Sequence, residues 1–353
     1  MALAGGAVMN VLALNLGSSS LKFSLYSVVS DAQEKVVQGD AALPSSEDAA
    51  TAAADGAIAS CLRQAHTIDA VGHRIVFGGE QDSACRITGD LLARLEGLQR
   101  LDPLHLPGQI AVIRAAQALL PHAVHVACFD TALFHDLPPF ARTLPLPPVS
   151  PQLRRYGFHG LSYASVLRAL GDELPARTVI THLGNGASAA AFHNGVPLNT
   201  TMGFTPLGGL LMSTRPGDID PGAMLYLMQH FENDDDEVRR VISTRSGLRA
   251  ISGGESDVRT LVSRNDEAAK LAVEMFVRSA ARAISGLAAD LGGLDLLVFT
   301  GGIGEHNESI RSAIASRVAF LNTALRVRVV ASNENEEIAH AAIALTAAET
   351  ETL

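Results

Sequence analysis

Two arginines in this sequence stand where a negatively charged substrate could be held. Arg74 ends an apolar stretch, and Arg215 lies in a segment rich in glycine, proline and aspartate. A guanidinium group grips the oxygens of a carboxylate or a phosphate by two parallel N–H bonds. A structural salt bridge is the alternative for both, with Asp218 or Asp220 as the partner of Arg215. The two arginines therefore indicate an anion site without identifying the anion.

Three turns of small residues follow apolar stretches. They are Gly17-Ser18-Ser19-Ser20, Gly184-Asn185-Gly186-Ala187-Ser188 and Gly301-Gly302-Ile303-Gly304. Glycine lets backbone N–H groups approach an anion closely, and hydroxyl and amide groups add donors. Each turn alone could simply close a hairpin, but three at the ends of apolar strands predict phosphate binding. None matches GxxxxGK[ST] or GxGxxG, which excludes a P-loop and a dinucleotide fingerprint.

One histidine and two carboxylates are further candidates. His159 lies between glycines and beside aromatic residues, a setting typical of a site loop, whereas His105 and His182 give weaker signals. Asp130, which follows an apolar strand, and Glu334 could bind Mg²⁺ or move a proton. The alternative for Asp130 is to cap the helix that follows it. No two histidines have the spacing of a zinc site, so we expect no structural metal.

Apolar strands must position these residues, and two parts of the chain repeat the same order. Residues 11–26 and 178–192 each indicate strand, turn and strand, and the prolines of residues 144–151 indicate a domain joint between them. The other expected elements are strands over 69–76, 123–129 and 294–300, and helices within 40–60 and over 109–120, 267–291 and 336–345. We therefore predict a duplicated α/β fold with a cleft between its halves.

Composition narrows the class of protein. Of 353 residues, 47% are hydrophobic and the formal charge is −10, which argues against disorder, nucleic-acid binding and a membrane surface. Cys61, Cys85 and Cys128 show no paired spacing and indicate reduced thiols, hence a cytoplasmic protein. Residues 1–8 lack a basic residue and predict a disordered extension rather than a signal peptide. No apolar run approaches the roughly 20 residues that span a bilayer.

Taken together, the segments resemble the acetate kinase family, within the actin/hexokinase-like superfamily. The block MGFTPLGGLLMSTRPGDIDPG at 202–222 is the most specific, and the motifs run in family order from Asn15 to about Ala339. The other matching motifs are NLGSSSLKFSLY (15–26), GHRIVFGGE (72–80), PLHLP (103–107), FDTALFH (129–135), RYGFHG (155–160), HLGNGAS (182–188), SGLRAISGGESDVR (246–259) and FTGGIGEHNESIR (299–311). The resemblance implies two duplicated actin/hexokinase-like (ribonuclease H-like) α/β domains around a nucleotide cleft. The first would be residues 1–148, joined by a returning helix at 340–353, and the second, nucleotide-binding domain would be residues 149–339.

The same resemblance implies a reversible reaction in which ATP and acetate give ADP and acetyl phosphate by direct in-line transfer. Mg²⁺, or Mn²⁺ in its place, would assist, and the chain would form a homodimer acting on small molecules. Because such a reaction brings anions together, its site must neutralise charge and align the reactants. The alternatives are a propionate or longer-acid kinase, a sugar kinase on the same fold and a catalytically weak nucleotide-binding paralogue. The TRPGDIDPG motif argues against a butyrate kinase.

Residue roles follow from the same resemblance. Arg74 and Arg215 would hold the carboxylate and the transferring phosphoryl group, and His159 would donate a hydrogen bond in the transition state. Lys22 would support the phosphates or brace the site. The residues implied in catalysis are therefore Lys22, Arg74, Asp130, His159 and Arg215, and those implied in metal binding are Asn15 and Glu334, with Asp130 helping to organise the metal's waters.

Nucleotide and acyl contacts are implied in the same way. ADP phosphates would meet the two glycine turns of the second half, and its ribose and adenine would meet the ESDVR motif. The implied nucleotide-binding residues are His182, Leu183, Gly184, Asn185, Gly186, Asp257, Val258, Arg259, Gly301, Gly302, Ile303 and Gly304. The acyl tail would face Val76, Leu104, Phe158 and Pro206. Acetate and propionate differ by one methylene, worth only about 1–3 kcal/mol in an apolar pocket.

Several positions depart from the family's usual pattern. Relatives generally carry His at 77, Asn at 106, Glu at 208, Gly at 213 and Glu at 335, where this chain has Phe77, Leu106, Gly208, Ser213 and Asn335. They also carry Thr-Ser-His where this chain has Leu161-Ser162-Tyr163. No departure removes a residue implied in chemistry. Those at 106 and 208 bear on the shape of the acyl pocket and on turnover.

Overall fold

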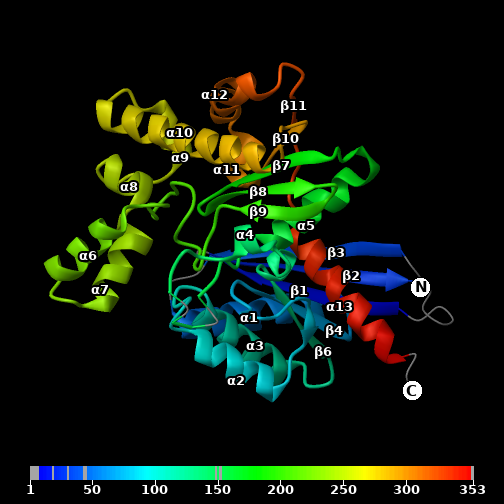
Figure 1. The fold of residues 1–353 in the computed structure, drawn as a ribbon. Helices are drawn as coiled ribbons and strands as arrows, with labels where there is room; N and C mark the ends of the chain where they lie inside the picture. The colour runs from blue at the N-terminus through cyan, green and yellow to red at the C-terminus, as the bar shows by residue number, and fades with distance from the viewer. Residues whose placement is uncertain are drawn as a thin grey trace. The chain divides into compact units, whose positions relative to one another are not determined.

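The computed structural model describes residues 8–17, 20–29, 32–42, 46–147, 149–150 and 153–350 (Figure 1). Contacts within it divide the chain into unit 1, Met1–His135 with Asn333–Leu353, and unit 2, Asp136–Ser332. Ser18 and Ser19 of the first predicted turn, Pro148 and Pro151 of the predicted joint, and residues 1–7 of the predicted extension lie outside the described residues. The domain boundaries at 148/149 and 339/340 stay predictions.

Unit 1 is built on a six-stranded mixed sheet of order β3-β2-β1-β4-β6-β5. β1 pairs antiparallel with β2 and parallel with β4, and β4 pairs parallel with β6. The strands are β1 Val8–Leu16, β2 Ser20–Val29, β3 Ala32–Ala42, β4 Ala70–Ile75, β5 Cys85–Arg86 and β6 Val124–Phe129, and the helices are α1 Glu47–Leu62, α2 Gly89–Leu98, α3 Leu106–Leu119 and α13 Glu334–Thr350.

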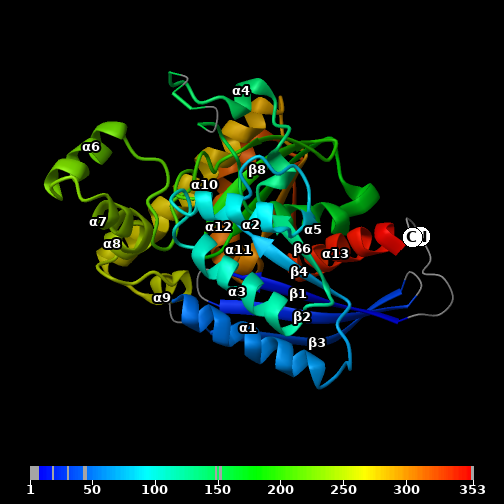
Figure 2. The ribbon, with the colours of Figure 1, turned by 90° about the horizontal axis from the view of Figure 1, so that it is seen from below.

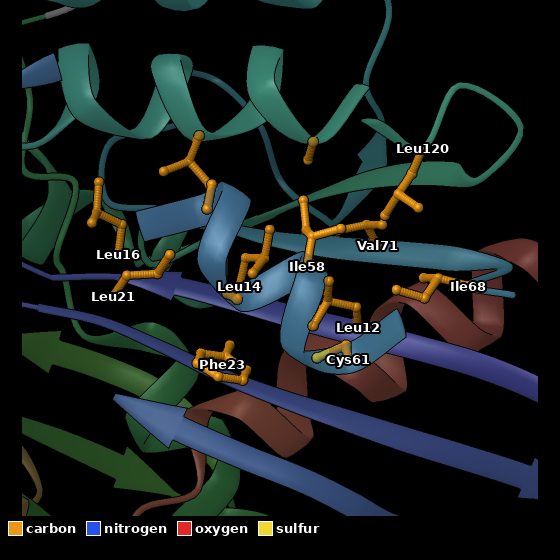
Figure 3. Close-up of a cluster of buried hydrophobic side chains, with 14 of the residues drawn as sticks. Leu12, Leu14, Leu16, Leu21, Phe23, Ile58, Cys61, Ile68, Val71 and Leu120 are labelled. Atoms are coloured by element: carbon orange, nitrogen blue, oxygen red, sulfur yellow. The ribbon is translucent and has the colours of Figure 1, made fainter. Parts of the chain in front are cut away.

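Alternation along β1 sends side chains to both faces of this sheet. Leu12, Leu14 and Leu16 enter one buried cluster with Ile58 and Cys61 of α1 (Figure 3). The other labelled residues of that cluster, between the sheet and helices α1 and α3, are Leu21, Phe23, Ile68, Val71 and Leu120. Because side chains of a strand alternate, Ala13 and Asn15 point to the opposite face.

Helix α13 covers that opposite face, where it packs on β1, β4 and β6. Its Ile338 lies against Gly72 of β4 and accepts a weak hydrogen bond from Cys128 Sγ of β6 at 3.8 Å. A segment from the end of the chain therefore completes the unit that the beginning of the chain starts. Figure 2 shows α13 in red beside the blue strands of the same unit.

Unit 2 contains a five-stranded mixed sheet of order β11-β10-β7-β8-β9. Its strands are β7 Arg177–Leu183, β8 Ala187–His193, β9 Val196–Thr200, β10 Leu296–Thr300 and β11 Arg326–Val329. Its helices are α4 Pro139–Arg142, α5 Gly160–Leu170, α6 Pro221–His230, α7 Asp235–Arg240, α8 Gly247–Ile251, α9 Val258–Ser263, α10 Glu267–Asp290, α11 Gly301–His306 and α12 Glu308–Val318. Within the described ranges, no helix combines the length and the apolar composition needed to cross a bilayer.

The two sheets share one topology, which confirms the predicted duplication. In each, a central strand pairs antiparallel with the next strand of the chain and parallel with a later one. The order β3-β2-β1-β4-β6 thus corresponds to β9-β8-β7-β10-β11. The sequence patterns missed β3, β5, β9 and β11. Strands β3 and β11 are largely exposed, β9 has one buried residue and β5 has only two residues. Helix α3 begins at Leu106 rather than at 109, since Pro107 is tolerated in a first helical turn.

Candidate active site

Arg74 and Asp130 form a buried ion pair at one edge of the unit 1 sheet. Arg74 Nη2 donates to Asp130 Oδ2 at 2.7 Å, and Arg74 Nε donates to both carboxylate oxygens at 3.1 and 3.3 Å. Arg74 lies on β4 and Asp130 directly follows β6, and these strands are parallel neighbours, so their carboxyl ends meet. The salt-bridge alternative for Arg74 is therefore realised, while the remaining N–H groups of Arg74 point to other polar side chains.

Asn15 connects this pair to the last helix. Its Oδ1 accepts from Arg74 Nη1 at 3.0 Å, and its Nδ2 donates to Glu334 Oε2 at 2.9 Å and to Asn335 Oδ1 at 3.1 Å. Asn335 Nδ2 donates in turn to Ser24 Oγ of β2 at 2.9 Å. Strands β1, β2 and β4 and helix α13 thus hold one polar network in a fixed arrangement.

Burial and neighbouring charges shift the pKa values of Arg74 and Asp130. Burial alone would lower the pKa of Arg74, but the carboxylates of Asp130 and Glu334 outweigh burial and raise it, so Arg74 stays cationic. Burial raises the pKa of the Asp130 carboxyl and the negative charge of Glu334 adds to this, while Arg74 opposes both. The guanidinium of Arg74 therefore interacts with both carboxylates of this edge of unit 1.

Three more residues, in α3 and in the segment just before it, support the same edge of the sheet. His105 Nδ1 lies 2.7 Å from Asp102 Oδ1, and both side chains are buried. Gln109 accepts from the Val76 backbone N–H at 3.1 Å and donates to the Leu16 carbonyl at 3.2 Å. Gln109 therefore ties the end of β1 to the end of β4. The sequence offered no signal for it, since a glutamine on a helix is ordinary.

The side chains of the Asn15 network could supply only a few oxygen ligands to Mg²⁺. Among the described residues, no group of three or more histidine, cysteine, aspartate or glutamate side chains is arranged to hold a metal ion. Mg²⁺ commonly takes only one or two protein carboxylates and completes its shell with water and substrate phosphates. Glu334 remains 15% exposed beside Asn15, so this pair fits such a sparse set of protein ligands.

The structure of unit 1 does not test the predicted roles of its remaining candidates, Lys22, Val76 and Leu104. Lys22 is exposed on β2, directly opposite Asn15 in the register of the two strands. Val76 is 4% exposed and Leu104 is 43% exposed, so only Val76 is enclosed by its own unit. Their predicted roles at the phosphates and at the acyl tail stay predictions.

In unit 2, His159 stands at the start of α5 in a conformation that few residues adopt. Its φ of 61° is left-handed, which costs energy for a side chain with a Cβ and is held by the surrounding contacts. Its Nδ1 lies 2.8 Å from Ser188 Oγ of β8, and its ring stacks on that of His182 with centroids 4.3 Å apart. His182 is itself held through Nδ1, 2.8 Å from Ser162 Oγ.

Arg215 and His159 approach the same glycine. A Cβ placed on Gly186 would lie 3.1 Å from His159 Nε2 and 3.6 Å from Arg215 Nη1. Arg215 is buried and donates from Nη1 to the Pro206 carbonyl at 2.8 Å. The turn that the sequence predicted to bind phosphate thus has a nitrogen of each of these side chains close to its Gly186.

The carboxylates near Arg215 in the sequence serve the backbone. Asp218 Oδ1 accepts from the Gly209 N–H at 2.7 Å, and Asp220 caps α6 by accepting from Gly222 and Ala223. These bonds fold the long 202–222 block on itself.

The third glycine motif differs from the sequence prediction, because Gly301–Gly304 forms the first turn of helix α11 rather than a free turn. Gly301 has φ 77°, and its N–H donates to Glu305 Oε1 at 3.0 Å. The same oxygen accepts from the Ser332 N–H at 3.1 Å. Glu305 therefore anchors the end of β10, and its place in the GGIGE motif was the only sequence signal for it. Since a Cβ on Gly301 would lie 2.8 Å from the Leu183 carbonyl and 3.1 Å from His182 Nε2, the two predicted nucleotide turns are neighbours.

The ESDVR residues have a clear local role. Asp257 caps α9, because its side chain accepts a hydrogen bond from the backbone N–H of Arg259 at 2.8 Å. The side chain of Arg259 also donates from Nη2 to Asp257 Oδ2 at 2.6 Å. Arg259 is 83% exposed and Val258 is buried. Their predicted contact with ribose and adenine stays a prediction, as does that of exposed Asn185.

The structure therefore gathers the predicted residues into two sets, each within its own unit. Unit 1 brings together Asn15, Arg74, Asp130 and Glu334. Unit 2 brings together His159, His182, Gly186, Arg215 and Gly301. Phe158 and Pro206 are buried in unit 2.

Known proteins match the chain over most of its length. The model of the Acetokinase family matches residues 10–348. An acetate kinase of Rhodopseudomonas palustris is 40% identical over 349 residues, covering 89% of this chain and 87% of that protein. An acetate kinase of Agathobacter rectalis is 37% identical over 351 residues, covering 89% and 88%.

Solved structures agree with this. The crystal structure of Porphyromonas gingivalis acetate kinase is similar with a TM-score of 0.79 at 30% identity, covering 96% of this chain and 99% of that one. A propionate kinase from Francisella tularensis gives a TM-score of 0.82 at 30% identity, covering 95% and 99%. These matches confirm the duplicated actin/hexokinase-like fold. The sequence, the fold and the relatives together establish that the chain belongs to the Acetokinase family.

Proposed function

We propose that this protein is a short-chain carboxylate kinase that reversibly converts ATP and acetate into ADP and acetyl phosphate. One observation carries the proposal: His159 Nε2 and Arg215 Nη1 lie 3.1 and 3.6 Å from the Cβ position of Gly186. Phosphoryl transfer needs donors directed at one point, because negative charge spreads over the equatorial oxygens of the transferring group. His159 Nε2 and Arg215 Nη1 can act as two such donors, and Gly186 leaves the space beside them open because it has no side chain.

The state of Asp130 favours a carboxylate acceptor over a hydroxyl acceptor. A sugar kinase needs a carboxylate base to remove the hydroxyl proton, whereas acetate is already an anion and needs none. Both oxygens of Asp130 accept hydrogen bonds from Arg74, so this carboxylate is committed to orienting a guanidinium. Arg74 oriented in this way suits the binding of a carboxylate.

Each residue then has a task in direct in-line transfer. Arg74 holds the acetate carboxylate, and Arg215 holds the transferring phosphoryl group. His159 donates to an equatorial oxygen as the negative charge spreads, and Lys22 supports the phosphates. Positioning and charge neutralisation supply most of the rate in such reactions.

Mg²⁺ belongs to this proposal as well. Asn15 and Glu334 would hold it through water, with Asp130 nearby, and it would neutralise the phosphate oxygens. ATP and ADP would meet His182–Gly186 and Gly301–Gly304 through their phosphates. Asp257, Val258 and Arg259 would meet the nucleoside.

Propionate is the second candidate acceptor, favoured by the similarity to a protein described as a propionate kinase. Val76, Leu104, Phe158 and Pro206 stay the proposed contacts of the acyl tail. One methylene changes binding by only about 1–3 kcal/mol, so both acids are expected to react at different rates.

A homodimer is also part of the proposal. Helix α6 has no buried residue, and its Leu225 and Tyr226 are 66% and 68% exposed. An exposed apolar helix of this kind is typical of a protein contact. The cytoplasmic location is inferred from Cys61, Cys85 and Cys128, all of which are free thiols.

The direct test measures acyl hydroxamate formed with ATP, Mg²⁺ and hydroxylamine on formate, acetate, propionate and butyrate in parallel. We expect product with acetate or propionate, and at least about a 100-fold loss in Arg215→Ala. Arg317→Ala is the matched control, because Arg317 pairs with Glu274 on the surface of the same unit. No hydroxamate from any acid, with ADP still binding, would reject the kinase and favour a nucleotide-binding paralogue.

A further inference from the structure

Two side chains behind His159 form a continuous hydrogen-bonded chain with it inside unit 2. Tyr163 of α5 places its hydroxyl 2.5 Å from Ser188 Oγ, and Ser188 Oγ lies 2.8 Å from His159 Nδ1. Tyr163 and Ser188 are both fully buried. The chain therefore acts on His159 from the side opposite to Nε2, which faces Gly186.

We propose that Tyr163 and Ser188 are positioning residues that hold His159 as the neutral tautomer with its proton on Nε2. The inference rests on the proposed function in one respect: it takes His159 Nε2 as the donor to the transferring phosphoryl group. It adds which residues set that donor, a role that the sequence patterns did not indicate.

Counting the protons of the hydrogen-bonded side chains leads to this tautomer of His159. Tyr163 and Ser188 each carry one hydroxyl proton. A phenol is a stronger donor and a weaker acceptor than an aliphatic alcohol, so Tyr163 donates to Ser188. The Ser188 hydroxyl has only His159 and Tyr163 as partners among the described residues, and it therefore donates its own proton to His159 Nδ1. A neutral imidazole that accepts at Nδ1 carries its proton on Nε2.

Tyr163, at the far end of the hydrogen-bonded side chains, fixes the direction in which their protons are donated. Burial raises the pKa of Tyr163 well above its ordinary value, so the phenol keeps its proton throughout the range in which the enzyme works. Tyr163 thus remains a donor and cannot reverse the polarity of the chain by ionising.

Stacking also fixes the orientation of the His159 ring. It stacks on His182, whose Nδ1 lies 2.8 Å from Ser162 Oγ, with an interplanar angle of 21°. Because Arg215 Nη1 lies near the same Gly186 position as Nε2, an Nε2–H group adds a neutral donor beside a cationic one. The opposite tautomer would present a lone pair there and repel a phosphoryl oxygen.

The test reads the tautomer directly, by long-range ¹H–¹⁵N correlation spectra of the full chain with ¹⁵N-labelled histidine, assigned with His159→Gln. We expect His159 to show a non-protonated Nδ1 and a protonated Nε2. In Ser188→Ala and Tyr163→Phe this pattern should change to a mixture of tautomers. Ser165→Ala should leave it unchanged, because the hydroxyl of that buried serine of α5 donates to the Ser162 carbonyl at 2.8 Å.

Kinetics separate positioning from a merely structural role. Ser188→Ala and Tyr163→Phe should lower kcat about 10- to 100-fold while KM for ATP and acetate changes less than about twofold. Ser188→Thr, which keeps the hydroxyl, should recover most of kcat. A thermal unfolding midpoint for each variant checks that the fold is retained.

Failures of the two proposals are distinguishable. A wild-type enzyme that makes acyl phosphate while His159 carries its proton on Nδ1 overturns this inference alone. So does Ser188→Ala that keeps both the tautomer and kcat. The expected tautomer in a protein that phosphorylates no acid would instead reject the proposed function.

Discussion

Gly72 of β4 and Ile338 of α13 approach so closely that no other residue fits at position 72. A Cβ there would lie 2.5 Å from Ile338 Cγ2 and 2.9 Å from the Ile338 carbonyl oxygen. Since the backbone oxygen cannot move aside, Gly72→Ala must push α13 off the sheet, and Glu334 with it. We expect a loss of about 1–3 kcal/mol in the free energy of unfolding and a clear loss of kcat.

Gly286→Ala is the control for this change, because nothing lies within 4 Å of a Cβ at that position in α10. It should stabilise the protein by up to about 1 kcal/mol and leave the rate unchanged. Urea unfolding and hydroxamate assays measure both quantities. Equal behaviour of the two variants would contradict the close packing of α13.

Filling the space over the second glycine turn should stop catalysis with little effect on folding. In Gly186→Ala the new methyl group would lie 3.1 Å from His159 Nε2 and 3.6 Å from Arg215 Nη1. It would occupy the space beside both nitrogens, so we expect kcat to fall at least about 100-fold. Gly203→Ala, also in unit 2 and with open space around its Cβ position, should remain active. An active Gly186→Ala enzyme would place phosphoryl transfer elsewhere.

Asp130→Asn should cost both stability and activity. The change leaves the buried Arg74 guanidinium without its main counter-charge, and breaking a buried pair typically costs about 3–5 kcal/mol. Asp295→Asn is the matched control, because it breaks the more exposed pair with Arg177 and should have a much smaller effect. Chemical denaturation compares the two variants. A stability loss no greater for Asp130→Asn would show that the pair is not buried in solution.

Acid should destabilise unit 1 through two stacked histidines. His73 Nε2 lies 3.1 Å from His125 Nδ1, and His125 Nε2 contacts the Leu120 carbonyl at 3.1 Å. Burial lowers the pKa of both residues, and for His73 the neighbouring His125 lowers it further. The unfolded chain therefore binds more protons below pH 6.5, so stability is present above that pH and is lost as the pH falls.

The limiting slope is about 1.4 kcal/mol per pH unit for each histidine. Unfolding by urea at pH 8, 6 and 5 measures it. His73→Leu should flatten the dependence, whereas substitution of exposed His66 by Gln should not. An unchanged slope in His73→Leu would assign the acid sensitivity to other groups.

Introducing the carboxylate that the family resemblance implies at 335 tests the charge of the Asn15 network. Asn335→Glu adds a negative charge beside Glu334 and removes the donor to Ser24 Oγ. We expect half-maximal activity at a lower Mg²⁺ concentration, because divalent cations favour added carboxylates. Asn335→Gln, which keeps the amide, should show no such gain, and equal Mg²⁺ dependence in all three proteins would exclude a role for this charge.

Local patterns predicted the strands that carry the chemistry, because a short apolar run such as residues 11–16 ends in a turn of small residues. They could not predict that Asn15 meets Glu334, since 319 residues separate the two and only the packing of α13 joins them. Ser188 was visible only as part of a small-residue turn. Its bond to His159 depends on the left-handed backbone of that residue, which no spacing encodes.

The two ends of the chain share unit 1, and this imposes an order on its synthesis. Asn15, Arg74 and Asp130 leave the ribosome early, whereas Glu334 and Asn335 follow after all of unit 2. Until then the face of the sheet that α13 will cover is open, with Gly72 and Cys128 uncovered. Because chains are made at only about 5–20 residues per second, this face stays exposed for many seconds. The growing protein is therefore unable to assemble its Asn15 network until Glu334 and Asn335 have followed unit 2 out of the ribosome.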